Sequence, residues 1–443
     1  MKNYIFVTFI FSSFVQSQII SIPDVIFKTR LLNASTSNTI AKNSFGENIK
    51  IDVNNNSEIE LSEALQVFEL RVERPFSSSN YINTLSGIEY FTNLKFLNCN
   101  DNNITNVYLQ NLTQLVTLQF ANNQLTTLDV SNLINLKYLH VRDNNLNVIQ
   151  FLNNNVMETI WASNNNLTSL NLTSMPTIKI VMVENNNLNN LNIIGLNNLI
   201  DLNCSYNSLS TLNLSTNLQL SWLFCSNNLL TNINVTTLPL KGLDISFNTI
   251  SNINVTGMPL LEYVTINNTL ITTFDGSNCG VLQLFCENNP NLTSINVKNN
   301  TFSYSDPDLL FFAFKISNNP MLQSICVDSG EQNNLAYFNY NTSGNVIVYG
   351  GNNCNVPLQI MSTESFVNNE AILFPNPVKN ELKFSFKNTV LIDNIFIYNT
   401  LGQLVKQFNG NQNVINLSDL KTGYYYIEFI SDKGKVNKKF IKE

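Results

Sequence analysis

Residues 220–240, LSWLFCSNNLLTNINVTTLPL, contain the pattern that decides the fold. Hydrophobic residues recur at fixed offsets along this stretch, at Leu220, Leu223, Cys225, Leu230, Ile233 and Val235. Trp222 and Phe224 stand between them, at positions where a short strand with one buried face meets solvent. The stretch therefore predicts a strand that is apolar on one face and carries two large rings on the other.

The same pattern occurs ten times, at a spacing of 21 residues that shortens to 20 twice. The first positions of the copies are Leu94, Leu115, Leu136, Met157, Ile178, Leu199, Leu220, Leu240, Leu261 and Val281. The ninth position is Asn in every copy except one, which has Thr269. One such turn cannot bury its own apolar stripe, so stacked turns that share a core are expected.

The pattern L-x-x-L-x-[C/hydrophobic]-x-x-N-x-L resembles the leucine-rich-repeat family over roughly residues 65–327. The resemblance implies a curved solenoid with a parallel β-sheet. The ninth-position Asn is predicted to be structural, because a buried amide at the end of a strand must bond backbone groups that leave the ladder.

Positions 3 and 5 of each copy are predicted to face outward on the concave side, and seven of these twenty residues are aromatic. Exposed apolar residues of this kind mark partner surfaces, where Trp and Tyr dominate binding energy. The alternative is that neighbouring rings only pack against one another. The predicted ligand-binding residues are Tyr138, His140, Trp161, Ile180, Met182, Trp222, Phe224, Tyr263 and Phe285.

Catalysis is the weaker interpretation of this face. His140 has no Ser, Cys or acid neighbour that would complete a triad. The concave carboxylates Asp201 and Asp244 are predicted to lie two strands apart, with about 11 Å between their backbones. Glycosidase carboxyl pairs are separated by ~5–9.5 Å. We therefore expect a binding protein, with a self-associating structural protein as the alternative and a carbohydrate-active enzyme third.

Residues 52–63, DVNNNSEIELSE, match the spacing of a calcium-binding EF-hand loop. Six residues would supply ligands, Glu58 through its carbonyl and Glu60 through water: Asp52, Asn54, Asn56, Glu58, Glu60 and Glu63. Ser57 departs from the glycine expected at the sharp turn. The loop resembles half an EF-hand, and the predicted calcium would be structural and stabilise an N-terminal cap. An Asn-rich turn without calcium is the alternative.

The N-terminus predicts export. Lys2 precedes an apolar run over residues 4–15, and residues 15–17 form a small-residue cleavage site, which predicts a signal peptide. No later segment has the ~20 apolar residues that span a bilayer. A net charge of −7 argues against nucleic acid as a partner. In an exported chain Cys326 and Cys354, which flank a degenerate segment, are predicted to form a disulfide.

The last 70 residues alternate short strands with turns at Asn-Gly, Lys-Thr-Gly and Asp-Lys-Gly, which predicts an antiparallel β-sandwich. Four segments, FPNP at 374, YNTLGQ at 398, LKTGYY at 420 and KKFIK at 438, resemble the type A sorting domain of the Bacteroidetes type IX secretion system. That resemblance implies the secretion machinery as a partner, export across the outer membrane, and a location at the cell surface or in the medium.

The predicted organisation has six parts. These are a signal peptide (1–17), an N-terminal cap with the EF-hand-like loop (18–80), leucine-rich repeats (81–327), an end cap (328–356), a linker (357–371) and the sorting domain (372–443).

Overall fold

The computed structural model describes residues 18–76, 79–173, 175–277, 279–280, 283–300, 314–329, 331, 346–350, 371–386, 391–400, 403–410, 412–431 and 434–443. The chain forms two compact units, which divide between Asn334 and Leu335. The predicted signal peptide and linker, with most of the end cap, lie outside the described residues. No described helix is long and apolar enough to cross a membrane.

The first unit is a solenoid built on a thirteen-stranded sheet, which confirms the predicted leucine-rich-repeat fold. Neighbouring strands pair in parallel one repeat apart, for example Leu202 with Leu223. The strands are short because each turn gives only the outward–inward–outward positions 3 to 5 to the ladder. In order they are β2 (Glu69–Arg71), β3 (Phe96–Asn98), β4 (Thr117–Gln119), β6 (Tyr138–His140), β8 (Thr159–Trp161), β10 (Ile180–Met182), β12 (Asp201–Asn203), β13 (Trp222–Phe224), β14 (Gly242–Asp244), β15 (Tyr263–Thr265), β17 (Gln283–Phe285) and β19 (Phe314–Lys315), with β1 (Ala41–Lys42) antiparallel at the edge.

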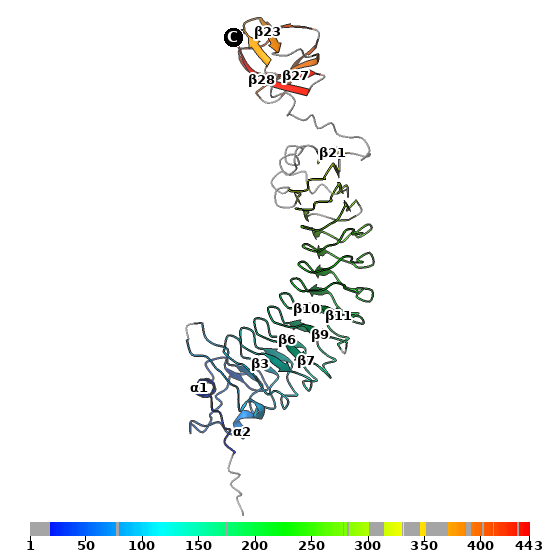
Figure 1. Cartoon of the computed structure of the whole chain (residues 1–443). Coiled ribbons are helices and arrows are strands. Elements are labelled where there is room, and N and C mark those ends of the chain that lie inside the picture. The colour runs from blue at the N-terminus through cyan, green and yellow to red at the C-terminus, as the bar shows by residue number, and fades with distance from the viewer. Residues whose placement is uncertain are drawn as a thin grey trace, which may run out of the picture. The chain divides into compact units, whose positions relative to one another are not determined.

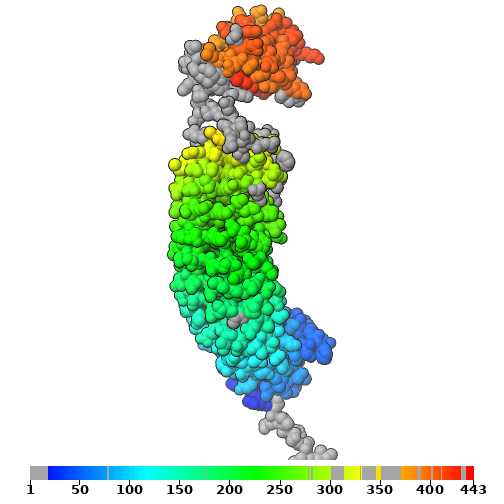
Figure 2. Space-filling model, turned by 90° about the vertical axis from the view of Figure 1, so that its right-hand side faces the viewer, coloured from blue at the N-terminus to red at the C-terminus, as the bar shows by residue number. Residues whose placement is uncertain are grey.

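A second column of strands returns along the outer side of the curve (Figure 1). These strands form parallel pairs or small sheets, such as β5 with β7. Figure 2 shows the turns of this unit as successive bands of colour, so each turn packs only on its neighbours. The outer strands are β5 (Thr127–Asp129), β7 (Val148–Gln150), β9 (Ser169–Asn171), β11 (Asn190–Asn192), β16 (Thr273–Asp275), β18 (Ser294–Asn296) and β20 (Ser324–Val327).

The N-terminal segment covers the open end of the solenoid. Helix α1 (Val25–Leu32) begins at Asp24, whose Oδ1 accepts hydrogen bonds from the backbone N–H groups of Ile26 and Phe27 at 2.9 Å. The other oxygen of Asp24 accepts the N–H groups of Asn83 and Thr84. One carboxylate therefore caps a helix and attaches it to the first turn. The short helices α2 (Leu61–Ala64) and η1 (Ile88–Tyr90) complete this region.

The Asn column has the predicted structural role. The Nδ2 of Asn144 donates to the carbonyls of Phe120, Val141 and Arg142, and its Oδ1 accepts the N–H of Leu125. Each Asn thus joins its own turn to the preceding one. Thr269, the exception, donates from its hydroxyl to the Ile266 carbonyl at 3.3 Å and to Asn289.

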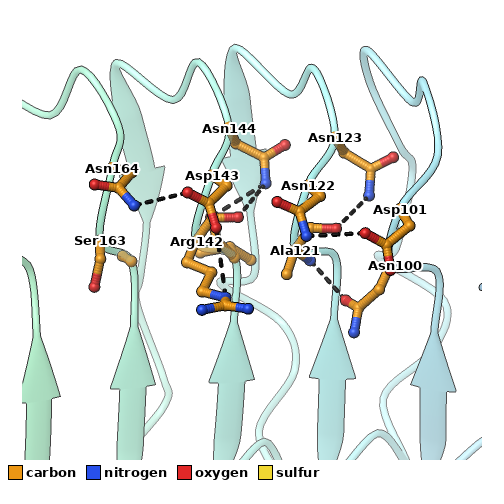
Figure 3. Close-up of polar contacts among 12 residues, drawn as sticks. Asn100, Asp101, Ala121, Asn122, Asn123, Arg142, Asp143, Asn144, Ser163 and Asn164 are labelled. Carbon is orange, nitrogen blue, oxygen red and sulfur yellow. Dashed lines mark hydrogen bonds and ion pairs between the residues drawn. The ribbon is translucent and has the colours of Figure 1, made fainter.

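The corner residue before each of these Asn side chains lies on the surface, and in some turns it bonds to the corner of the neighbouring turn. Its backbone is left-handed, with φ between 52° and 59°, a conformation that Asn and Asp tolerate best. Asn122 donates to Asp101 at 2.9 Å and Asn164 donates to Asp143 at 2.7 Å (Figure 3). Amide side chains therefore stabilise both the interior and the rim of the turn.

The second unit contains the antiparallel β-sandwich predicted for the C-terminal residues. One sheet has the order β22–β23–β26 and the other β25–β24–β27–β28, and their facing side chains, such as Phe384, Ile397 and Phe429, form one core. The strands of the sandwich are β22 (Ala371–Phe374), β23 (Glu381–Phe386), β24 (Ile392–Asn399), β25 (Leu404–Asn409), β26 (Val414–Asn416), β27 (Gly423–Ser431) and β28 (Gly434–Lys442), whereas β21 (Ile347–Gly350) lies outside these two sheets.

Candidate functional site

The concave strands place their side chains as the period of two requires. In β6 the middle residue Leu139 is buried at 1% exposure, while Tyr138 before it is 42% exposed. Trp161 and Trp222 on the same face are 41% and 37% exposed. Both tryptophans of the chain therefore present part of an indole to solvent from the inner side of the curve.

A pocket of about 340 Å³ lies on this face across β4, β6, β8 and β10. Four of the nine predicted ligand-binding residues come together in it, and the remaining walls are Thr117, Gln119, Leu139 and Thr159. The four are Tyr138, His140, Trp161 and Ile180. Thr117, Gln119 and Thr159 were not among the ligand-binding residues predicted from the sequence. Their outward positions on β4 and β8 could have identified them.

His140 lines this pocket. Its ring meets Trp161 edge to face, with centroids 4.9 Å apart and planes at 90°. The buried Nε2 of His140 has no hydrogen-bond partner among the described residues. Burial, followed by the positive charge of Arg142, lowers the pKa of His140, so the imidazole is neutral at pH 7. The pocket is therefore aromatic and uncharged.

Trp222 lies flat on the neighbouring strand, and Gly242 explains how. A Cβ at Gly242 would lie 2.2 Å from Cε3 and 2.4 Å from Cζ3 of the indole, so only glycine leaves room for this ring. Phe224, two residues on, is nearly parallel to Trp222, with the planes 15° apart and the centroids at 6.1 Å. Together the two rings make a broad aromatic surface.

The remaining predicted residues are less open. Tyr263 packs against Phe285 with centroids 5.8 Å apart, and the Lys315 ammonium lies 5.6 Å from the Phe285 ring. Met182 is half-buried on β10. The rings thus form three clusters: the pocket around Trp161, the Trp222–Phe224 surface, and the Tyr263–Phe285 pair. Mutual packing, the alternative raised by the sequence, describes the third cluster best.

The two concave carboxylates differ in their surroundings. Oδ1 of Asp244 accepts the backbone N–H of Ser246 at 2.9 Å, which is a local turn contact. Oδ1 of Asp201 is buried without a hydrogen-bond partner among the described residues, and burial, then the charge of Glu184, raises the pKa of that carboxyl. The two acids do not share a proton or a common partner in these contacts.

The predicted calcium loop closes on its own hydrogen bonds. The carboxylate of Asp52 accepts the N–H groups of Asn56 and Ser57, and Glu63 accepts those of Val53 and Glu60. Burial, followed by the hydrogen bond with Glu60, raises the pKa of Glu63.

The other loop oxygens also have partners. Glu60 accepts the side-chain amides of Asn54 and Asn56, and the carboxylate of Glu58 pairs with Lys28 at 2.7 Å. Ser57 adopts the left-handed φ of 63° that glycine was expected to supply. Among the described residues no group of three or more His, Cys, Asp or Glu is arranged to hold a metal. The binding of calcium by this loop stays a prediction.

The cysteines divide into two kinds. Cys99, Cys204, Cys225 and Cys286 are free and buried, and burial raises the pKa of each thiol. Cys279 is also free and buried, with its Sγ 3.0 Å from the Val255 carbonyl. Cys326 is disulfide-bonded. Its predicted partner Cys354 lies outside the described residues, so the pairing stays a prediction.

Comparisons with known proteins agree with both parts of the chain. Residues 372–443 match the family described as "Secretion system C-terminal sorting domain". The chain is therefore exported by type IX secretion to the cell surface or the medium, with the secretion machinery as a partner. No curated protein matches the sequence.

Solved structures resemble the chain in fold. The functional domain of InlJ from Listeria monocytogenes is 20% identical, with a TM-score of 0.50 over 96% of this chain and 99% of that one. An internalin, InlF, from the same species is 21% identical, with a TM-score of 0.48 over 75% and 92%. YopM, a leucine-rich effector protein from Yersinia pestis, is 21% identical, with a TM-score of 0.40 over 61% and 79%. The likeness to InlJ supports the leucine-rich-repeat fold.

Proposed function

We propose that this exported protein is a non-enzymatic binding protein whose concave face recognises a protein or glycan outside the cell. The observation that carries the proposal is the exposure of Tyr138, Trp161 and Trp222 on one face, where the first two line a 340 Å³ pocket. Pockets of roughly 300–1,000 Å³ that combine apolar walls with a few polar groups are typical of ligand sites.

The chemistry of the face favours binding over catalysis. A reaction would require a nucleophile or a paired acid and base within hydrogen-bond reach. The pocket supplies a neutral imidazole, two threonines and a glutamine among its polar groups. These side chains donate and accept hydrogen bonds, and the rings beside them stack on a flat or apolar group of the partner.

The experiment is a screen of the full chain on arrays of glycans and of surface proteins, followed by Trp161→Ala and Trp222→Ala. Truncation of an exposed anchor ring at an interface typically costs ~2 kcal/mol or more, which is about thirtyfold in Kd. Tyr108→Ala is the matched control, because Tyr108 is 59% exposed and outside the concave strands.

Two outcomes would contradict the proposal. A ligand whose affinity is the same for both tryptophan variants and for Tyr108→Ala would place recognition elsewhere. If sedimentation shows a concentration-dependent oligomer that Trp222→Ala dissociates, the face mediates self-association and the protein is a surface structural component.

A further inference from the structure

Four consecutive turns carry large apolar residues on the outer rim, where the other turns carry small or polar ones. These residues are Tyr206, Leu229, Phe247 and Leu270, with exposures of 55%, 58%, 51% and 38%. We refer to the four as the rim patch. Tyr206 and Phe247 occupy the left-handed corner position, and the two leucines occupy the position two residues later in their turns.

The two corner residues of the rim patch differ from the residue type found at this position in the other turns. The other corner residues of this column are Asn or Asp, which tolerate φ near +55°. Tyr206 and Phe247 adopt φ of 53° and 52°, where a bulky side chain is strained. They also lack the amide that bonds along the rim elsewhere, as in Asn318 with Asn288 at 3.0 Å. Neither side chain belongs to the buried core of the solenoid, since more than half of each is exposed.

Residues that weaken the fold without a structural gain are expected at functional positions. The turns that hold the rim patch are in register, since the Tyr206 N–H donates to the Ser226 carbonyl at 2.8 Å and the Phe247 N–H donates to Asn267 at 2.8 Å. Consecutive turns are ~4.8 Å apart. The four side chains therefore project from neighbouring turns of one rim.

The charge on the rim indicates the kind of partner. At the rim positions of these four turns the residues around the patch are Ser, Thr and Asn, from Ser205 to Asn268, with no Asp, Glu, Lys or Arg. Charged rim residues begin on either side, at Glu184 and at Glu287. An apolar centre within a neutral polar rim is the composition of a protein–protein interface. Exposed leucines suit an apolar protein surface better than the hydroxyl groups of a sugar.

The rim patch follows the strands of the proposed concave site in the sequence. Tyr206 follows β12 and Phe247 follows β14, and the strand between them, β13, carries Trp222 and Phe224. We propose that the ligand is a protein with an apolar segment that contacts the Trp222–Phe224 surface and extends over the rim patch. This inference rests on the proposed function and assigns its partner class.

The test uses the full chain, a phage-displayed library of random 12-residue peptides as the probe, and two double variants. Tyr206→Asn/Phe247→Asn restores the corner residue of the other turns, so this variant should melt no lower than the wild type. Peptides selected on the wild type should be rich in apolar residues and should bind this variant at least tenfold more weakly. The control Ile134→Asn/Leu218→Asn replaces two exposed apolar residues, 52% and 58% exposed, outside the rim, and should leave binding unchanged.

Three results would overturn the inference. The first is that no peptide is enriched, or that enriched peptides bind the rim variant and the control equally. The second is a wild-type oligomer that the rim variant converts to a monomer, which would make a second copy the occupant. The third is binding of a neutral oligosaccharide that is lost on Trp222→Ala and unaffected by the rim variant. That third result would leave the proposed function intact, whereas insensitivity of every ligand to Trp161→Ala, Trp222→Ala and the rim variant would remove both.

Discussion

Replacing Asn228 by alanine tests whether the amide ladder stabilises the solenoid. Asn228 is 6% exposed and makes four hydrogen bonds. Its Nδ2 donates to the carbonyls of Cys204, Cys225 and Ser226, at 3.0, 3.1 and 3.2 Å, and its Oδ1 accepts the Leu209 N–H at 2.9 Å.

The four backbone groups that bond to Asn228 differ in whether they keep another hydrogen-bond partner when the amide is removed. The Cys204 carbonyl keeps a second donor, Asn207, and the Cys225 carbonyl keeps Asn248. The Ser226 carbonyl keeps the Tyr206 N–H. For the buried Leu209 N–H, Asn228 is the partner found among the described residues. An orphaned buried donor costs ~1–3 kcal/mol, and the three weakened carbonyls add about 1 more, so we expect a loss of about 3 kcal/mol.

Urea unfolding of the full chain, followed by tryptophan fluorescence, measures this loss. Both tryptophans, Trp161 and Trp222, lie in the repeats, so the signal reports the solenoid and not the sorting domain. Asn232→Ala is the control, because Asn232 is an exposed residue of the same turn. Asn228→Thr keeps a hydroxyl, as at Thr269, and should fall between the two. If Asn228→Ala and Asn232→Ala unfold within about 0.5 kcal/mol of each other, the ladder is not a major source of stability.

Three further predictions concern single groups. His140 is the chain's one histidine, and burial lowers its pKa in the folded state. The folded protein should therefore lose stability as pH falls below about 6.5, because the unfolded chain binds the proton first. An NMR titration of the His140 ring that gives a pKa of about 6.5 or above would contradict this. If the EF-hand-like loop binds calcium, EDTA should lower the melting temperature of the wild type but not of Glu63→Gln; equal melting of the wild type with and without EDTA refutes the site. Non-reducing peptide mapping should recover Cys326 linked to Cys354, and a different partner would show that the predicted pairing is wrong.

Much of the fold follows from spacing. The 21-residue period places Leu223 and Cys225 in the core and assigns Asn228 to the end of a strand, because a repeated turn has one way to bury its apolar stripe. The turn signals and alternating residues near the C-terminus likewise predict the antiparallel sandwich. These features depend on residues close in sequence, so they can be predicted from the sequence alone.

The state of the concave face depends on neighbours about 21 residues away. The sequence places Trp222, Tyr263 and Phe285 on one face, yet the structure shows the first lying open on Gly242 and the other two packed together. Side-chain rotation and the size of the residue on the next strand decide this, and a repeat pattern encodes neither.

The sequence by itself therefore determined the architecture: the period, the inward and outward residues, the amide column and the sorting domain. Only the tertiary structure decided which outward rings meet solvent, that four outward residues including a neutral histidine enclose a pocket, and that the exposed corners Tyr206 and Phe247 are left-handed. The physical reason is that burial within one turn is set by the alternation of inward and outward residues along the chain. Contacts between turns depend instead on the shapes of side chains that stacking brings together.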